Sequence, residues 1–353
     1  MTRALPPAAE AGHLTQALRR AGALGAGQVA SVVAEASFAT VLSHVFRLRL
    51  TFDGPAGGAP GSLILKAGLP DRPGGPWRGG LAEVAFYRDV APAAPAGLVP
   101  RCFEAEADPE AGTWHVLLED LTDSHAVATR WPLPPTEAQC AAIVEARARF
   151  HAAWWNDPRL GASLGTSPAL DAPPVRDFAD RYARFQAEMG DRLSPRQRDL
   201  FERFLDALPR LAERHRGAGR LTILHGDSHV WNCFLPRDGS DDVRLFDWDA
   251  WRIGIGTDDL AYMMALHWYP PQRQAFERPM LDRYHAALAA AGVRGLDRDT
   301  VGRDYRMSVL WQIATPVTQH AIGIPPLIWW NNLERIHLAV EDLDCRSLLH
   351  EER

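Results

Sequence analysis

The stretch from Leu221 to Ala261 decides how the rest of the chain is interpreted. It runs Leu221-Thr-Ile-Leu224, then His225-Gly-Asp227-Ser-His229-Val-Trp-Asn232, then Cys-Phe-Leu-Pro236, and after a polar turn Val243-Arg-Leu-Phe-Asp247-Trp-Asp249. Short apolar runs that end in polar groups are typical of strands joined by turns. We therefore predict a β-hairpin-like element whose polar side chains gather at the strand ends.

Three side chains of this stretch carry oxygen atoms of the kind that a hard cation binds. They are Asp227, Asn232 and Asp247. Mg²⁺ takes few protein oxygens and keeps several waters. Phosphoryl transfer uses such a set, with one carboxylate at the acceptor hydroxyl and Asn and Asp oxygens on the metal that binds the phosphates. The spacing therefore indicates transfer of a phosphoryl group.

The same residues resemble the catalytic loop and metal-binding segment of the aminoglycoside phosphotransferase and choline kinase family. That family has His-Gly-Asp, four further residues and Asn, followed by an apolar strand that ends in Asp. The resemblance implies ATP or another nucleoside triphosphate as phosphoryl donor and Mg²⁺ as cofactor. It implies Asp227 as the catalytic carboxylate and Asn232 and Asp247 as metal ligands. The resemblance also implies that a helix starts within Gly254 to Ala261 and that the aspartate before Leu260-Ala261, Asp259, has a structural role.

The resemblance also implies an α+β fold of the bilobal, protein-kinase-like type. We expect an N-terminal nucleotide-binding lobe at residues 1–118 with a small antiparallel sheet and one helix. We expect an interlobe linker to follow at 119–125. After it we expect a mainly helical lobe at 126–353, which contains the catalytic loop and the acceptor site. The residue pattern agrees, because 29–121 contains five strand-like runs and one helical run. Helices are expected at 137–155, 175–189, 195–216, 259–269, 273–291, 298–319 and 326–343.

Lys66 is the single lysine among 38 basic side chains, the others all being Arg. It ends the apolar run Gly61-Ser-Leu-Ile-Leu-Lys66, which predicts a short buried strand. An ammonium group is a compact point charge suited to phosphate oxygens, whereas guanidinium is a wide planar fork. In protein-kinase-like folds a helix glutamate holds this lysine on the phosphates. Glu83, near the start of the next helical pattern, is the candidate partner; the alternative is a solvated carboxylate at a helix N-terminus.

Two further segments complete the expected nucleotide site. The turn Ser37-Phe-Ala-Thr40 between two strands lacks a Gly-x-Gly-x-x-Gly pattern, so Ser37 and Thr40 are candidate phosphate contacts through hydroxyls and backbone amides. The alternative is a plain hairpin turn. The segment from Glu119 to Leu121 resembles the family's interlobe linker, whose backbone groups meet the adenine edge.

Composition limits the classes of function. The chain has 353 residues, 46% of them hydrophobic and 23% charged, which is typical of a globular protein. A net charge of −6 gives no electrostatic footprint for nucleic acid. The four cysteines lack metal-ligand spacing, and the sequence shows neither a signal peptide nor an apolar run long enough for a membrane span. We therefore expect a cytoplasmic enzyme, a monomer or a homodimer, acting on a small hydroxyl-bearing molecule.

Several alternatives stay open at this stage. His229 and Asp249 are candidate contacts for the acceptor, which could be an aminoglycoside-type antibiotic or another hydroxylated metabolite. His225, Asp227 and His229, with Asp247, could instead form a transition-metal hydrolase site. The hydrolase alternative leaves Lys66, Glu83 and Asn232 unexplained. A nucleotide-binding module without catalysis is the third alternative. His151 and His225 are expected to be packed residues, and Asp258 and Asp259 to cap a helix.

Overall fold

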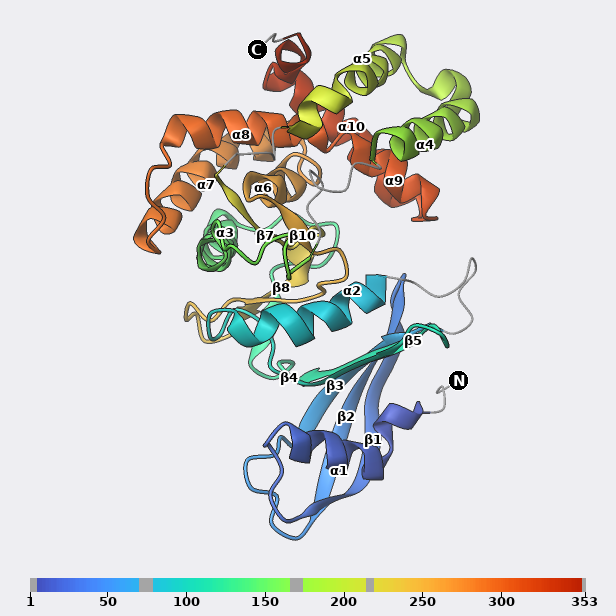
Figure 1. The fold of residues 1–353 in the computed structure, drawn as a ribbon, viewed down its shortest axis with the longest axis vertical. Coiled ribbons are helices and arrows are strands. Elements are labelled where there is room, and N and C mark those ends of the chain that lie inside the picture. The colour runs from blue at the N-terminus through green and yellow to red at the C-terminus, as the bar shows by residue number, and fades with distance from the viewer. Residues whose placement is uncertain (1–4, 70–78, 166–173, 214–218, 351–353) are drawn as a thin grey trace. The chain divides into compact units, whose positions relative to one another are not determined.

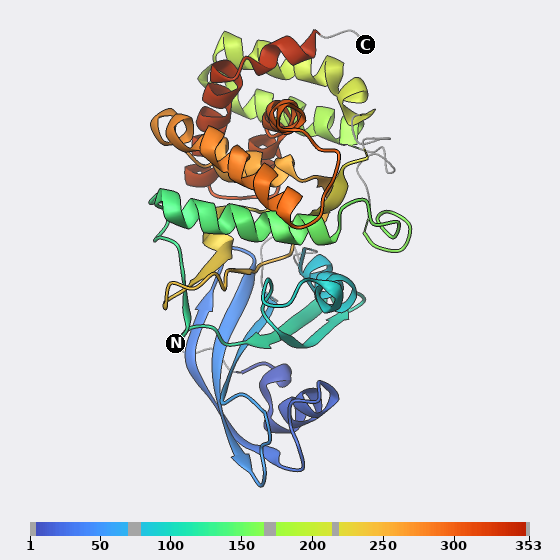
Figure 2. The ribbon, with the colours of Figure 1, turned by 90° about the vertical axis from the view of Figure 1, so that its left-hand side faces the viewer.

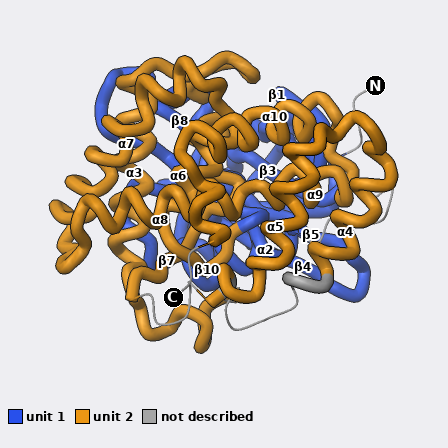
Figure 3. The backbone as a smooth tube through the Cα atoms, turned by 90° about the horizontal axis from the view of Figure 1, so that it is seen from above, with its two compact units in different colours: residues 1–126, 234–250 blue, residues 127–233, 251–353 orange. Residues whose placement is uncertain are grey.

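The structure, a computed structural model, describes residues 5–69, 79–165, 174–213 and 219–350. The chain divides into two compact units, coloured separately in Figure 3. The first comprises 1–126 and 234–250, and the second 127–233 and 251–353. Residues 234–250, with Asp247, thus belong to the first unit, whereas Asp227 and Asn232 of the same stretch belong to the second. The lobe boundaries 1–118, 119–125 and 126–353 stay a prediction.

A five-stranded antiparallel sheet forms the framework of the first unit (Figure 1), as the sequence predicts. Its strand order is β1-β2-β3-β5-β4. In the register, Phe46 lies opposite Leu65, and Leu65 opposite Leu117, so apolar residues align across the sheet on one face. The bounds are β1 Gln28–Ala39, β2 Ser43–Asp53, β3 Ser62–Gly68, β4 Cys102–Asp108 and β5 Thr113–Glu119.

The two faces of this sheet have different partners. Helix α1 (Ala11–Arg20) buries Leu14 and Leu18 against Leu48, Leu63 and Leu65. Because successive side chains of a strand point to opposite faces, Lys66 lies on the other face. That face is met by α2 (Gly79–Ala85), which continues into the short helical turns η2 (Phe86–Val90) and η3 (Ala91–Ala93). The alternation of β3 therefore separates an apolar core from a polar site.

The catalytic stretch folds into two pairings, so the prediction of one hairpin-like element is wrong. Strand β7 (Leu221–Leu224) pairs with β10 (Arg252–Ile255), beyond Asp247. Strands β8 (Cys233–Pro236) and β9 (Arg244–Leu245) flank the polar turn and form a sheet with β6 (His125–Val127). The physical reason is that β7 is apolar and buried, so it pairs with a strand that is also apolar. In β10, Ile253 and Ile255 are both buried.

Helices make up most of the second unit, and Figure 2 shows the long helix α3 in green alongside α7 in orange. Thr136 and Gln139 form the predicted start of α3 as a capping box. The helix predicted at 298–319 is two helices, because the chain turns at Gln312 and Ile313. The bounds are α3 Glu137–Ala153, α4 Pro174–Met189, α5 Pro195–Ala212, α6 Thr257–Met264, α7 Pro270–Ala290, α8 Arg298–Trp311, α9 Ala314–Ala321 and α10 Pro326–Asp342.

Two features concern the chain as a whole. In the part that the structure describes, no helix combines the length and the apolar composition that crossing a bilayer requires. Cys102, Cys140, Cys233 and Cys345 are free thiols, as their spacing suggests. The sheet of the first unit and the helices of the second agree with the predicted α+β class.

Candidate active site

Lys66 lies at the centre of a polar group in the first unit. Its Nζ donates one hydrogen bond to Glu83 Oε2 at 2.5 Å and another to Asp247 Oδ1 at 2.5 Å. The Glu83 side chain is 1% exposed and Lys66 12%, whereas Asp247 is 34% exposed. The pair expected between Lys66 and Glu83 is therefore present. Asp247, which is 181 residues further along the chain, joins it.

Burial and charge act in opposite directions on this group. Burial alone lowers the pKa of Lys66, but the negative charges of Asp247, Glu83 and Asp249 outweigh it and raise this pKa above its ordinary value. Burial also raises the pKa of Glu83, and the Lys66 ammonium opposes that rise. Lys66 therefore stays a cation at neutral pH and can bind phosphate oxygens. Asp249, a proposed acceptor contact, is thus close enough to Lys66 for its charge to raise the pKa of the ammonium group.

The segment that carries Asp247 is held by aromatic packing. Trp248 is fully buried and stacks on Phe86, with ring centroids 3.9 Å apart and planes at 6°. Its Nε1 donates to the Leu245 carbonyl at 3.0 Å. Phe86 follows the helix that carries Glu83, so one stack ties both partners of Lys66 together. Asp247 itself has φ 68°, a left-handed conformation uncommon outside glycine and concentrated at functional sites.

The turn near Thr40, proposed to contact phosphate, differs in detail from its prediction. Strand β1 continues to Ala39, so Ser37 lies within the strand opposite Phe46 and not in the turn. Ser37 Oγ shares a hydrogen bond with His44 Nε2 at 2.8 Å. Thr40 does lie in the turn, where its Oγ1 accepts from the Ser43 amide at 3.0 Å. Both hydroxyls thus already stabilise the hairpin, and their contact with phosphate stays a proposal.

Glu119 and Leu121, the residues proposed to flank adenine, lie at the end of β5 and just after it. Glu119 Oε1 accepts from the Arg101 amide at 2.9 Å and from Arg244 at 3.0 Å. The Leu121 carbonyl accepts from the His125 amide at 2.8 Å, and the Leu121 side chain is buried. The Glu119 side chain therefore stabilises the segment itself, and contact of its backbone with adenine stays a proposal.

Asp227 is the centre of a second polar group, in the second unit. Tyr262 Oη donates to its Oδ1 at 2.5 Å, and Asn232 Nδ2 donates to its Oδ2 at 3.1 Å and to its carbonyl at 2.8 Å. His229 Nε2 lies 3.4 Å from Oδ2. The loop between β7 and the helical turn η6 (Val230–Asn232) supplies Asp227, and Gly226 before it has φ 84°. The loop thus brings together the predicted catalytic carboxylate, one predicted metal ligand and His229.

The surroundings keep Asp227 ionised. Burial by itself raises the pKa of Asp227, but the nearby His229 and the hydrogen bond from Tyr262 outweigh it and hold this pKa below its ordinary value. The side chain is 30% exposed, so a substrate can reach it. A carboxylate that is ionised at neutral pH and reachable from solvent can orient a hydroxyl group and accept its proton.

Asp259 anchors the catalytic loop and does not cap a helix through its side chain, contrary to the prediction. Its Oδ2 and Oδ1 accept from the backbone amides of His225 at 2.8 Å and Gly226 at 3.0 Å. The buried imidazole of His151 lies 3.2 Å from Oδ2 and bonds Tyr284 on its other side. Asp258 accepts from Ser308, so it too bonds outside its own helix. Asp259 therefore has the structural role that the resemblance implies, and His151 is a packed residue, as expected.

The hydrolase alternative lacks the required geometry. Among the described residues, His225, Asp227 and His229 do not form a group of three ligands close enough to hold one ion. His225 is buried and is fixed through its amide by Asp259. His229 packs its ring against Trp231 and His267, with centroids 5.4 and 5.5 Å away. These contacts make His225 and His229 parts of the loop's frame.

Sequence reasoning missed Tyr262. Tyr262 follows Asp259 by three positions on α6, so the two side chains share one helix face. Because Asp259 binds the amides just before Asp227, a tyrosine on the same face reaches the carboxylate. The helical period of Asp259-Leu-Ala-Tyr262 was the available signal.

Comparison with known proteins adds independent information. The profile of the "Phosphotransferase enzyme family" matches residues 57–296, which contain Lys66, Glu83, Asp227, Asn232 and Asp247. No curated protein sequence matches the chain.

Solved structures share the fold. A protein from Ralstonia eutropha JMP134, assigned to the aminoglycoside phosphotransferases, aligns with a TM-score of 0.59 and 16% identity over 96% of this chain and 98% of its own. The microcompartment-associated aminopropanol kinase aligns at 0.54 with 13% identity, over 94% and 99%. A choline/ethanolamine kinase family protein from Mesorhizobium loti aligns at 0.53 with 14% identity, over 89% and 91%. The fold is therefore the protein-kinase-like one.

Proposed function

Because the chain belongs to the phosphotransferase enzyme family and is a kinase of that class, we propose that it transfers the γ-phosphoryl group of ATP, with Mg²⁺, to a hydroxyl group of a small molecule. The observation that carries the proposal is the position of Lys66, the single lysine of the chain, whose ammonium binds both Glu83 and Asp247. A lysine held between a helix glutamate and a metal-binding aspartate is the arrangement that phosphoryl transfer uses.

Each residue has a separate task in this mechanism. Lys66 holds phosphate oxygens, and Glu83 holds Lys66 in place. Asp227 accepts a hydrogen bond from the acceptor hydroxyl and orients its oxygen toward the γ-phosphorus. As the new P–O bond forms, the bond from this phosphorus to the bridging oxygen breaks, ADP leaves, and Asp227 receives the hydroxyl proton. Tyr262 and Asn232 fix the Asp227 carboxylate in one orientation. Orientation and charge stabilisation carry most of the rate in such reactions.

The proposed magnesium ligands present suitable atoms. Within the described residues the hydrogen bond of Asp247 engages Oδ1, which leaves Oδ2 for a cation. Asn232 uses Nδ2 to bond Asp227, which leaves its carbonyl Oδ1 for the same purpose. Carboxylate and amide oxygens are ligands that Mg²⁺ accepts. When bound, the ion neutralises charge that develops on the phosphate oxygens.

The acceptor is proposed to be an aminoglycoside-type antibiotic or another hydroxylated metabolite. The overall charge of −6 suits a cationic acceptor of this kind. The side chains of His229 and Tyr262 contact Asp227, and the rings of Trp231 and His267 pack against these two, which suits a compact organic molecule. One solved neighbour, amicoumacin kinase, was determined with AMP-PNP, Ca²⁺ and Ami (TM-score 0.53, 16% identity), which supports the use of a nucleotide with a divalent metal.

The test is a turnover assay over a panel of aminoglycosides, amino alcohols and sugars, with ATP and Mg²⁺. Asp227→Asn should lower kcat about 10²–10⁴-fold, because the proton acceptor is removed. It should leave the Kd of Mg-ATP within a few-fold of the wild type. Asp282→Asn, which removes an exposed partner of Arg298, is the matched control and should keep full activity.

Unchanged turnover in Asp227→Asn would refute its role. Nucleotide binding without turnover on any acceptor would favour a binding module instead. Activity that survives complete removal of divalent cations would refute the proposed magnesium dependence.

A further inference from the structure

A second polar cluster lies in the first unit, on the face of the sheet opposite to Lys66. It consists of His13 on α1, Glu104 on β4 and His115 on β5. His13 Nε2 lies 2.5 Å and His115 Nε2 2.8 Å from the same oxygen, Glu104 Oε2. All three ligand atoms lie within 4.8 Å of one another. None of these residues takes part in the proposed phosphoryl transfer.

An irregularity in the sheet places Glu104 on this face. Cys102 lies opposite Leu118, but Glu104 lies opposite Leu117, so the register shifts between them. Without that shift Glu104 would lie opposite Val116, which itself lies opposite Lys66, and would point to the catalytic face. Bulges commonly re-aim a side chain in this manner. The bulge thus buries a carboxylate beneath α1, where apolar packing alone would favour a hydrophobic residue.

The carboxylate is ionised and its second oxygen is held. The Glu104 side chain is 5% exposed. Burial alone raises its pKa, but hydrogen bonds from His115, His13 and Arg20 outweigh this and hold the pKa at about 2. Arg20 donates to Oε1, so Oε2 is the oxygen that faces the two imidazoles. A charged partner on the non-ligating oxygen is how outer contacts orient a metal-binding carboxylate.

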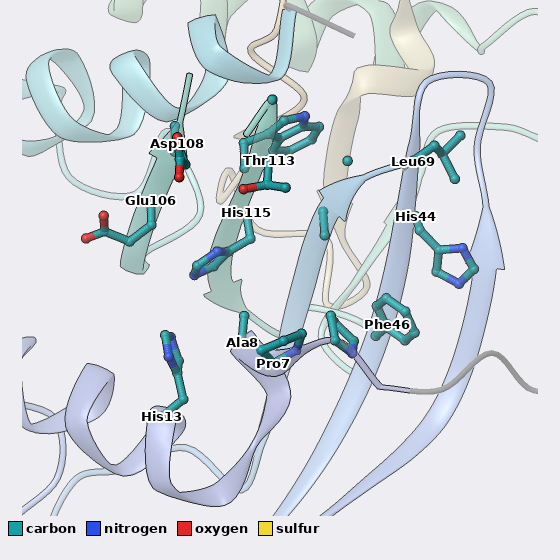
Figure 4. Close-up of a pocket in the computed structure, with 16 residues that line it drawn as sticks. Pro7, Ala8, His13, His44, Phe46, Leu69, Glu106, Asp108, Thr113 and His115 are labelled. Atoms are coloured by element: carbon teal, nitrogen blue, oxygen red, sulfur yellow. The ribbon is translucent and has the colours of Figure 1, made fainter. Parts of the chain in front are cut away.

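The cluster borders a cavity of about 590 Å³. Figure 4 shows the His13 and His115 rings pointing toward each other at the edge of this cavity, with Glu106 and Asp108 nearby. The ring centroids are 5.5 Å apart and the planes meet at 69°. Two imidazole nitrogens and one carboxylate oxygen beside a cavity correspond to three protein ligands plus one position for water, a set that Zn²⁺ takes.

We propose that His13, Glu104 and His115 bind a transition-metal dication of the zinc type, with the fourth position open to the cavity. Imidazole and carboxylate ligands suit Zn²⁺ and exclude a preference for Mg²⁺. Around a tetrahedral ion the ligand atoms lie about 3.4 Å apart, given metal–ligand bonds near 2.1 Å. Binding therefore spreads the present separations of 2.5 and 2.8 Å by less than about 1 Å. The His13 side chain, 33% exposed at the surface of α1, has room to move.

Zinc binding to the full chain tests the proposal. The metal-free protein, in excess Mg²⁺ to occupy hard-ligand sites, is titrated with Zn²⁺ by calorimetry. The wild type should bind one equivalent of Zn²⁺. In His13→Asn and in His115→Asn this binding should be absent or its Kd at least tenfold higher. His320→Asn is the matched control, because His320 forms a 2.9 Å pair with Glu188 outside any three-ligand group of the described residues. It should keep the zinc equivalent.

A second measurement needs no variant. Bound Zn²⁺ should protect His13 and His115 from diethylpyrocarbonate, as read by peptide mass spectrometry, and should leave His320 unprotected. Failure of Zn²⁺ to bind, equal binding by wild type and both cluster variants, or unchanged modification of His13 would each overturn the proposal. In those cases the cluster serves only as a set of hydrogen bonds that connect α1 to the sheet.

Discussion

At the scale of single residues, the hydroxyl of Tyr262 is the contact that most directly controls Asp227. It donates to Oδ1 at 2.5 Å, while Asn232 holds Oδ2. Together they leave the carboxylate one orientation. Tyr262 acts through Asp227 and is a positioning residue, so its loss should affect the reaction rate and the titration of Asp227 more than nucleotide binding.

Tyr262→Phe should lower kcat about tenfold and leave KM for ATP nearly unchanged. A hydrogen bond to a charged group contributes about 1.5–3 kcal/mol. Because part of this energy stabilises the transition state, its loss lowers kcat. Steady-state kinetics check this. Tyr305→Phe is the matched control, because Tyr305 donates to Glu277 at 2.6 Å in a buried pair of the same kind. It should lower thermal stability and keep kcat.

The pH profile separates positioning from a structural effect. Asp227 has a lowered pKa, so its base form persists as pH falls and kcat should decline only in acid. The Tyr262 hydrogen bond helps to lower that pKa, so in Tyr262→Phe the acid limb should move to higher pH. An unmoved acid limb with lower kcat would contradict the assignment.

At the scale of elements, the start of α2 depends on a glycine. A Cβ at Gly80 would lie 1.9 Å from Trp114 Cε2, a distance that real atoms do not reach. The Trp114 ring also lies 5.9 Å from Lys66 Nζ. The close approach of α2 to β5 thus sets the distance from Glu83 to Lys66, and a larger residue at position 80 must displace one of them.

Gly80→Ala should raise KM for ATP and lower the free energy of unfolding by about 1–3 kcal/mol, the usual cost of overpacking. Nucleotide titration and thermal unfolding measure both. Gly12→Ala in α1 is the control, because a Cβ there meets nothing within 4 Å. Alanine should be neutral or slightly stabilising at that position. Equal behaviour of the two variants would show that α2 is not constrained in this way.

At the scale of the whole molecule, buried carboxylates determine the response to acid. The pKa of Glu104 is held at about 2, below its ordinary 4.5. A lowered pKa contributes stability that is present above pH 4.5 and is lost as pH falls toward 2. The shift corresponds to about 3 kcal/mol at neutral pH. Asp259, whose pKa is also lowered despite its burial, adds a further loss of stability as pH falls below 3.8, its ordinary value.

Glu104→Gln should lower the melting temperature at pH 7 and flatten its decline between pH 4.5 and 3, measured with EDTA present. Glu106→Gln is the control, because Glu106 forms an exposed pair with Arg88. Its melting curve should follow the wild type. A decline of equal slope in Glu104→Gln would show that this carboxylate does not govern acid stability.

Much of the fold could be predicted from local pattern. Alternation identified the five strands of 29–121, and the capping residues Thr136 and Ser194 identified two helix starts. Bounds and pairings were less predictable. Ser37 belongs to a strand because its partner Phe46 extends the ladder, and residues 298–319 bend because Gln312 turns toward the Asp258 carbonyl. Both depend on contacts with distant residues.

The sequence alone determined the family resemblance, the spacing of Asp227, Asn232 and Asp247, and the distinct status of Lys66, since these depend on residue type and order. Only the tertiary structure decided that Asp247 joins Lys66, that Tyr262 holds Asp227, and that a bulge turns Glu104 toward two histidines. The reason is that strand register and helix packing depend on the apolar surface that distant segments bury together, and no local pattern records which segments those are.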